Sequence, residues 1–119
     1  MLVRDELSAA SAHTYEFNLH APAPIVAADA SHFSVANGGQ SVCARSQGAG
    51  AARETRSGAA AKAGTTESHG AFTVKNDGRS AAEFLVLLDV GCKRPVVNIA
   101  ANADSSHTVT VGAQSVIVN

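Results

Sequence analysis

The sequence predicts an all-β fold, an antiparallel β-sandwich of about seven or eight strands. Short segments alternate apolar and polar residues, and clusters of Gly, Asn, Asp and Ser separate them at intervals of roughly 8–12 residues. No segment repeats with the period of about 20 to 50 residues that indicates a solenoid. Aromatic residues make up 4% of the chain and Trp is absent, so the core must consist mainly of Val, Leu, Ile and Ala.

Composition narrows the class of protein further. The chain has 119 residues, enough for one domain with a buried core, and it is 45% hydrophobic and 16% charged. A net charge of −1 offers no basic surface, so we expect no binding to nucleic acid. No apolar run reaches the roughly 18 residues that a membrane-spanning helix needs, so membrane insertion is not expected.

The N-terminus is weakly patterned. We expect residues 1–12 to be a loose segment, which leaves 13–119 as the single domain. Asp5 and Glu6 stand where a signal peptide would be apolar, so either the chain is cytoplasmic or a leader has been removed.

The first two expected strands flank a proline-rich break. In residues 13–20, "HTYEFNLH", alternate apolar side chains from Tyr15 to Leu19 share one face, which is typical of a half-buried strand. The prolines of "APAP" exclude a central paired strand, and residues 25–28 form a short second strand.

A hairpin is predicted next. Residues 31–36 and 40–45 flank Asn37–Gly39, "NGG", and Asn-Gly between alternating segments is a strong hairpin signal because both residues tolerate positive φ. Phe33 and Val35 share one face of the first of these strands.

Residues 46–69 consist mainly of Ala, Gly, Ser, Thr and charged residues, without a large apolar side chain. A helix over 49–63 lacks an apolar face to anchor it, so we expect a long mobile excursion.

The most apolar stretch, Ser80–Cys92, fits two structures. Ser80 with Glu83 resembles a helix capping box, whereas the turn-like "NDG" before it and the β pattern on both sides favour a buried strand. We therefore expect Ala81–Val90 to be a central strand. Further strands are expected in "AFTVK" (71–75), in "RPVVNIAA" (94–101), in "HTVTV" and in "SVIVN", the last as an exposed edge.

Cys43 and Cys92 form a disulfide or remain two buried thiols, depending on the redox compartment. Cys43 lies between Val42 and Ala44, which favours a packed or bridged residue over a nucleophile.

The histidines do not predict a metal site. No HxH, HExxH or CxxC motif is present, so exposed positions at turns and strand ends are favoured over zinc or copper ligation. The five histidines are His13, His20, His32, His69 and His107.

No catalytic group is expected either. Asp104, Ser105, Ser106 and His107 are adjacent in "ADSSHT", whereas the members of a Ser-His-Asp triad converge from separate elements, so these residues are interpreted as a turn. Asp89 lies among apolar residues and needs a partner, for which Lys93 or Arg94 is at hand in an ion pair.

The segment "AFTVKNDGRSAAEFLVLLDVG…HTVTVGAQSVIVN" resembles the latter half of bacterial extracytoplasmic immunoglobulin-like modules, in which a strand, a turn and a long strand precede a "TVTV…G" hairpin. The resemblance implies a sandwich and carries over no functional residue. Antibody-type domains are marked by a buried Trp and by a Tyr two residues before the second cysteine. This chain has no Trp, and no Tyr stands two residues before Cys92.

Together these features favour a non-enzymatic interaction or structural protein, bacterial and either of the envelope or secreted. It needs no cofactor, and it meets a protein partner through an edge strand or the 46–69 excursion. The alternatives are a small-ligand or carbohydrate-binding sandwich, and a metal-binding protein or enzyme that uses the histidines.

Overall fold

The computed structural model, which describes residues 1–29, 32–47, 52–59, 64–75 and 78–119, is all-β and antiparallel. Its described residues contain eleven strands and no helix, whereas seven or eight strands were expected. The strands are β1 (Leu2–Ser8), β2 (Tyr15–Ala21), β3 (Ile25–Asp29), β4 (His32–Asn37), β5 (Gln40–Ser46), β6 (Ala52–Ala59), β7 (Thr66–Val74), β8 (Ala81–Val90), β9 (Val97–Ala101), β10 (His107–Val111) and β11 (Gln114–Val118).

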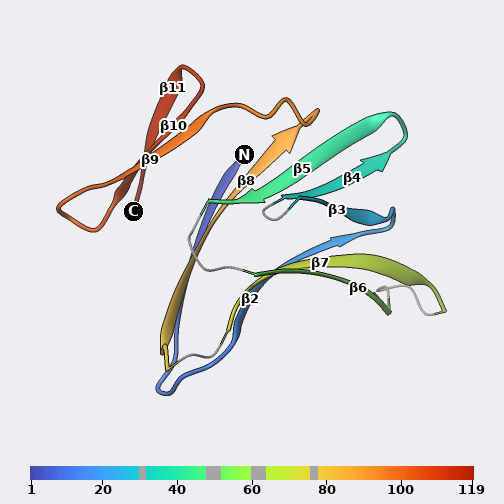
Figure 1. The fold of residues 1–119 in the computed structure, drawn as a ribbon, viewed down its shortest axis with the longest axis horizontal. Coiled ribbons are helices and arrows are strands. Elements are labelled where there is room, and N and C mark those ends of the chain that lie inside the picture. The colour runs from blue at the N-terminus through green and yellow to red at the C-terminus, as the bar shows by residue number, and fades with distance from the viewer. Residues whose placement is uncertain (30–31, 48–51, 60–63, 76–77) are drawn as a thin grey trace.

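The strands form three sheets (Figure 1). The largest has the order β1-β8-β5-β4-β3, a second has the order β2-β7-β6, and the third is the C-terminal meander β11-β10-β9. No helix among the described residues has the length and apolar character that a membrane crossing needs.

The main core lies between the five-stranded sheet and the β2-β7-β6 sheet, which gives a sandwich-like pair of layers. Its buried side chains are Tyr15, Ile25, Phe33, Ala44, Phe72, Val74, Phe84 and Val86. Gly70 of β7 marks how closely the layers approach, because a Cβ there would lie 3.2 Å from both Ile25 Cγ2 and Phe33 Cζ.

The stretch Ala81–Val90 is a strand, as predicted. It lies between β1 and β5, and its middle residues, from Phe84 to Leu87, are buried on both faces. Phe84 and Val86 belong to the main core, whereas Leu85 lies beside Ile99 of β9 on the opposite face. With β8 confirmed as a strand, the capping-box pattern at Ser80 has no structural counterpart.

The predicted hairpin is also confirmed. Asn37 pairs with Gln40, so the turn consists of Gly38 and Gly39, at φ 57° and 77°. Positive φ at both central residues matches the right-handed twist of the flanking strands, and glycine adopts it without strain.

The expectation of a loose N-terminal segment at 1–12 is wrong for Leu2–Ser8. These residues form β1 and pair along β8 from Leu2↔Leu87 to Ser8↔Ala81. The Met1 amine donates a hydrogen bond to the Leu88 carbonyl at 2.8 Å. The outer backbone groups of β8 require partners, and β1 supplies them although its own side chains are largely polar.

The prediction of a long mobile excursion at 46–69 is wrong for the part of this segment that the structure describes. Residues 52–59 form β6, which pairs with β7 from Ala52↔Thr73 to Ala59↔Thr66. Backbone hydrogen bonds to a neighbouring strand need no large apolar side chain, and the sequence argument had relied on such side chains alone. Residues 48–51 and 60–63, which the same prediction covered, lie outside the described part of the chain.

A disulfide joins Cys43 of β5 to Cys92, with the two Cα atoms 5.0 Å apart. Cys92 follows β8 in a turn in which Gly91 and Cys92 both have positive φ, 81° and 51°. The Cys92 amide donates to the Asp89 carbonyl at 3.2 Å, and this turn brings the Cys92 sulfur back to β5. Because β5 and β8 are neighbours, the bridge lies within one sheet.

Candidate functional site

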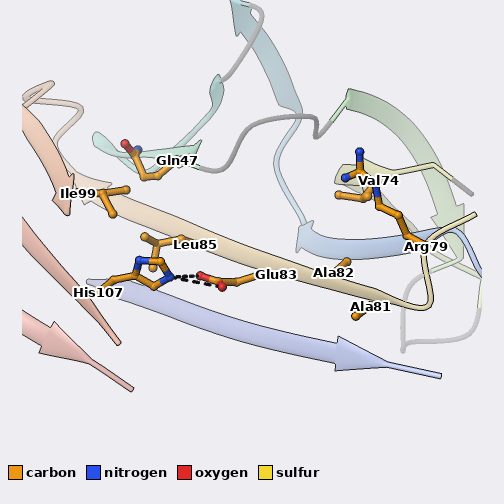
Figure 2. A pocket seen from close by; sticks show the side chains of 9 residues that line it. All are labelled: Gln47, Val74, Arg79, Ala81, Ala82, Glu83, Leu85, Ile99 and His107. Carbon is orange, nitrogen blue, oxygen red and sulfur yellow. Dashed lines mark hydrogen bonds and ion pairs between the residues drawn. The ribbon is translucent and has the colours of Figure 1, made fainter. Parts of the chain in front are cut away.

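A cleft of about 400 Å³ lies where the C-terminal meander meets β8 (Figure 2). Ile99 and His107 lie toward one end of the cleft, and Val74 and Arg79 toward the other. Its lining residues are Gln47, Val74, Arg79, Ala81, Ala82, Glu83, Leu85, Ile99 and His107. Apart from His107 none of them has a ring, so the cleft offers no stacking surface for a sugar.

A charged cluster closes the His107 end of the cleft. Glu83 of β8 accepts a hydrogen bond from Arg4 Nε at 3.3 Å and lies 3.1 Å from His107 Nε2. Arg4 also pairs with Glu6 at 2.5 Å, and the Arg4 side chain is only 9% exposed. Glu83 therefore ties β1 and β10 to β8.

The charge state of Glu83 follows from these neighbours. Burial raises the pKa of this carboxyl, but the hydrogen bond and charge of Arg4, together with those of His107, outweigh that effect and lower the pKa below 4.5. Glu83 is therefore ionised at neutral pH.

The "ADSSHT" residues form the predicted turn and not a triad. Asp104 Oδ1 accepts hydrogen bonds from the Ser106 amide at 3.1 Å and the Ser106 hydroxyl at 2.6 Å. These bonds lower the pKa of Asp104. His107 is engaged by Glu83 instead, so serine, histidine and aspartate are not aligned for nucleophilic attack.

Asp89 finds its partner in the main chain. Its Oδ2 accepts a hydrogen bond from the Arg94 backbone amide at 2.7 Å, where an ion pair with the Lys93 or Arg94 side chain was expected. Arg94 has positive φ, 52°, so the carboxylate stabilises the turn that carries Cys92.

Two of the five histidines come together, and three lie apart. His20 of β2 pairs in register with His69 of β7, and both rings contact Glu67. His13 contacts Ser11, and His32 contacts Asp29. The sequence signal that was missed is the spacing of Glu67 and His69. In a strand, residues two apart lie on the same face, so this spacing places a carboxylate beside an imidazole.

The edge strand β11 is exposed and uncharged. Among the described strands it pairs only with β10, and Val116 and Ile117 are 50% and 63% exposed. The edges β1, β2, β3 and β6 each carry at least one Asp or Glu, whereas β9 and β11 carry no charged residue. Charged residues are a common protection of sheet edges against pairing with another strand.

No protein-family model, no curated protein and no solved structure matches this chain.

Proposed function

We propose that this chain is a non-enzymatic structural or interaction module, an immunoglobulin-like β-sandwich of the bacterial envelope or a secreted protein, that associates through β11. The observation that carries the proposal is this edge strand, because it combines unpaired backbone groups, two exposed apolar side chains and no charge. Such an edge is suited to pairing with another strand.

The partner we propose is a second copy of the chain. Antiparallel self-pairing about Val116 places Ser115 opposite Ile117, and Gln114 opposite Val118, so no like charges meet. The two C-terminal sheets then become one continuous sheet about a twofold axis, a symmetric arrangement common in homodimers.

Two features support the compartment and the class. The Cys43–Cys92 disulfide is compatible with an oxidising, extracytoplasmic environment. Two antiparallel layers around one core fit an immunoglobulin-like sandwich, although the disulfide here lies within a sheet, whereas in antibody domains it joins the two sheets. The bacterial assignment rests on the sequence resemblance.

The test is sedimentation equilibrium of the oxidised protein over a range of concentrations. We expect a dimer that Ile117→Lys dissociates, because an edge lysine would place like charges close together across the twofold axis. The matched control, Val90→Lys, changes a valine that is 66% exposed at the end of an internal strand and leaves the dimer intact. A wild-type monomer at about 0.1 mM, where even weak association is detected, would contradict the proposal.

The cleft favours a second candidate, the binding of a small ligand with an apolar body. Leu85 and Ile99 provide an apolar wall beside the ionised Glu83. We expect the uncharged fluorescent probe Nile red to bind there and Ile99→Gln to weaken its binding. Equal fluorescence with both proteins would exclude the cleft as the site.

A further inference from the structure

His20, Glu67 and His69 converge on the face of the β2-β7 ladder that points away from the main core. His20 and His69 are directly opposite each other in the register, and Glu67 lies two residues before His69 on the same face. Gly70 and Phe72 of β7, with the opposite parity, face the core. Two neighbouring strands thus present three ligand-type side chains at one place.

The ligand atoms of the three residues lie close together. Glu67 Oε1 lies 3.0 Å from His20 Nδ1 and 3.2 Å from His69 Nε2. The two imidazole rings are stacked, with centroids 4.0 Å apart and an interplanar angle of 10°. One ligand atom from each residue lies within 4.8 Å of the others.

These separations suit a small tetrahedral ion. Bonds of roughly 2.0 Å to an ion at the centre of a tetrahedron place neighbouring ligand atoms about 3.3 Å apart. The two observed nitrogen–oxygen distances are close to that value, so modest side-chain adjustment brings all three atoms into a coordination shell.

The donor set selects the class of ion. Two imidazole nitrogens and one carboxylate oxygen suit first-row divalent ions such as Zn²⁺, whereas Ca²⁺ and Mg²⁺ prefer oxygen ligands. The His20 side chain is 50% exposed and those of Glu67 and His69 are 21% exposed, so the cluster is open to solvent on one side. Three protein ligands leave a fourth position for water.

We propose that His20, Glu67 and His69 form a Zn²⁺ site on the outer face of the β2-β7 ladder. The site is independent of β11 and joins two strands that are distant in sequence. Binding replaces the hydrogen bonds to Glu67, and each ring then ligates as a neutral imidazole that carries its remaining proton on the nitrogen that does not bind the ion.

Other charged residues occupy nearby register positions. Arg56 of β6 is opposite His69, and Glu54 of β6 is opposite Ala71, while Glu16 of β2 is opposite Thr73. Zn²⁺ competes with protons for the two imidazoles, so its affinity falls as the solution is acidified.

The test is isothermal titration of the oxidised protein with ZnCl₂ at neutral pH, beside CaCl₂. We expect one equivalent of Zn²⁺ to bind and raise the melting temperature, and no response to Ca²⁺. His69→Ala and Glu67→Gln should each weaken Zn²⁺ binding by more than about tenfold. Changing a residue that only supports a metal ligand already weakens binding by about tenfold or more, so the loss of a ligand should cost at least that much. His13→Ala, at a histidine distant from the cluster, is the matched control and should bind as the wild type does.

Two further observations keep the result interpretable. Circular dichroism of each variant without metal establishes that it folds, and Co²⁺ in place of Zn²⁺ reports four-coordinate geometry by its visible absorption. The proposal is overturned if the wild type binds no Zn²⁺, or if folded His69→Ala and Glu67→Gln proteins bind it unchanged.

Discussion

Replacing Cys43 and Cys92 together by alanine measures how far the fold depends on the disulfide. The bond spans a sequence separation of 49 residues. In the chain-entropy model, opening a loop of that length returns about 14 cal/mol/K to the unfolded chain, or about 4 kcal/mol at 25 °C. Strands β5 and β8 are paired from Val42↔Val90 to Ser46↔Val86, on both sides of Cys43. The native fold therefore persists without the bridge, and the effect falls on the unfolded state.

The assay is urea and thermal unfolding followed by far-ultraviolet circular dichroism. We expect the double alanine variant to lose about 4 kcal/mol of unfolding free energy. For a domain of this size that corresponds to a fall of about 15 °C in melting temperature. Reduction of the wild type with dithiothreitol should produce a similar loss and should leave the variant unaffected.

The reduced wild type also serves as the packing control, because it keeps both sulfur atoms. Cys43 is 8% exposed, so any additional loss in the variant reports the packing of that side chain. If oxidised and reduced wild-type proteins differ by less than about 1 kcal/mol, the loop-entropy reasoning is refuted.

Three other substitutions test the core and the charged cluster. Gly70→Ala should cost about 1 to 2 kcal/mol in urea unfolding, because the added methyl group meets Phe33 and Ile25 at 3.2 Å; unchanged stability would mean that the layers separate easily. Phe72→Ala, at a residue 1% exposed, should cost about 3 to 5 kcal/mol by the same measurement, and a loss below 1 kcal/mol would place this ring outside the core. Because the pKa of Glu83 is lowered from 4.5 in the folded state, its stabilisation is present above that pH and is lost as the pH falls through the folded value. The gap in melting temperature between wild type and Glu83→Gln should therefore be present at pH 7 and close in acid, and a gap that persists in acid would contradict the role of the ionised carboxylate.

Sequence patterns predicted the elements whose side chains alternate between core and solvent. Tyr15, Phe17 and Leu19 pack in or against the core, and the glycines after Asn37 make the turn. The apolar run at Ala81–Val90 was ambiguous by itself and was assigned correctly from its β neighbours.

The same patterns failed where strands are held by backbone pairing. β1 and β6 have mixed polar sequences, and their place depends on free edges of β8 and β7 that no local pattern reveals. The cluster of His20, Glu67 and His69 was missed for the same reason, since the two segments meet only through the register of β2 with β7. Glu83 and Arg4 likewise meet only because β1 lies along β8.

The pairing of Leu2 with Leu87 has a consequence for the growing polypeptide. Synthesis begins at the N-terminus, so β1 emerges long before β8 exists to receive it. During that interval a nascent β1 has a free backbone that other chains are able to join. Arg4, Asp5 and Glu6 give β1 three consecutive charged residues, and charges within an exposed segment are a common protection against aggregation before folding is complete.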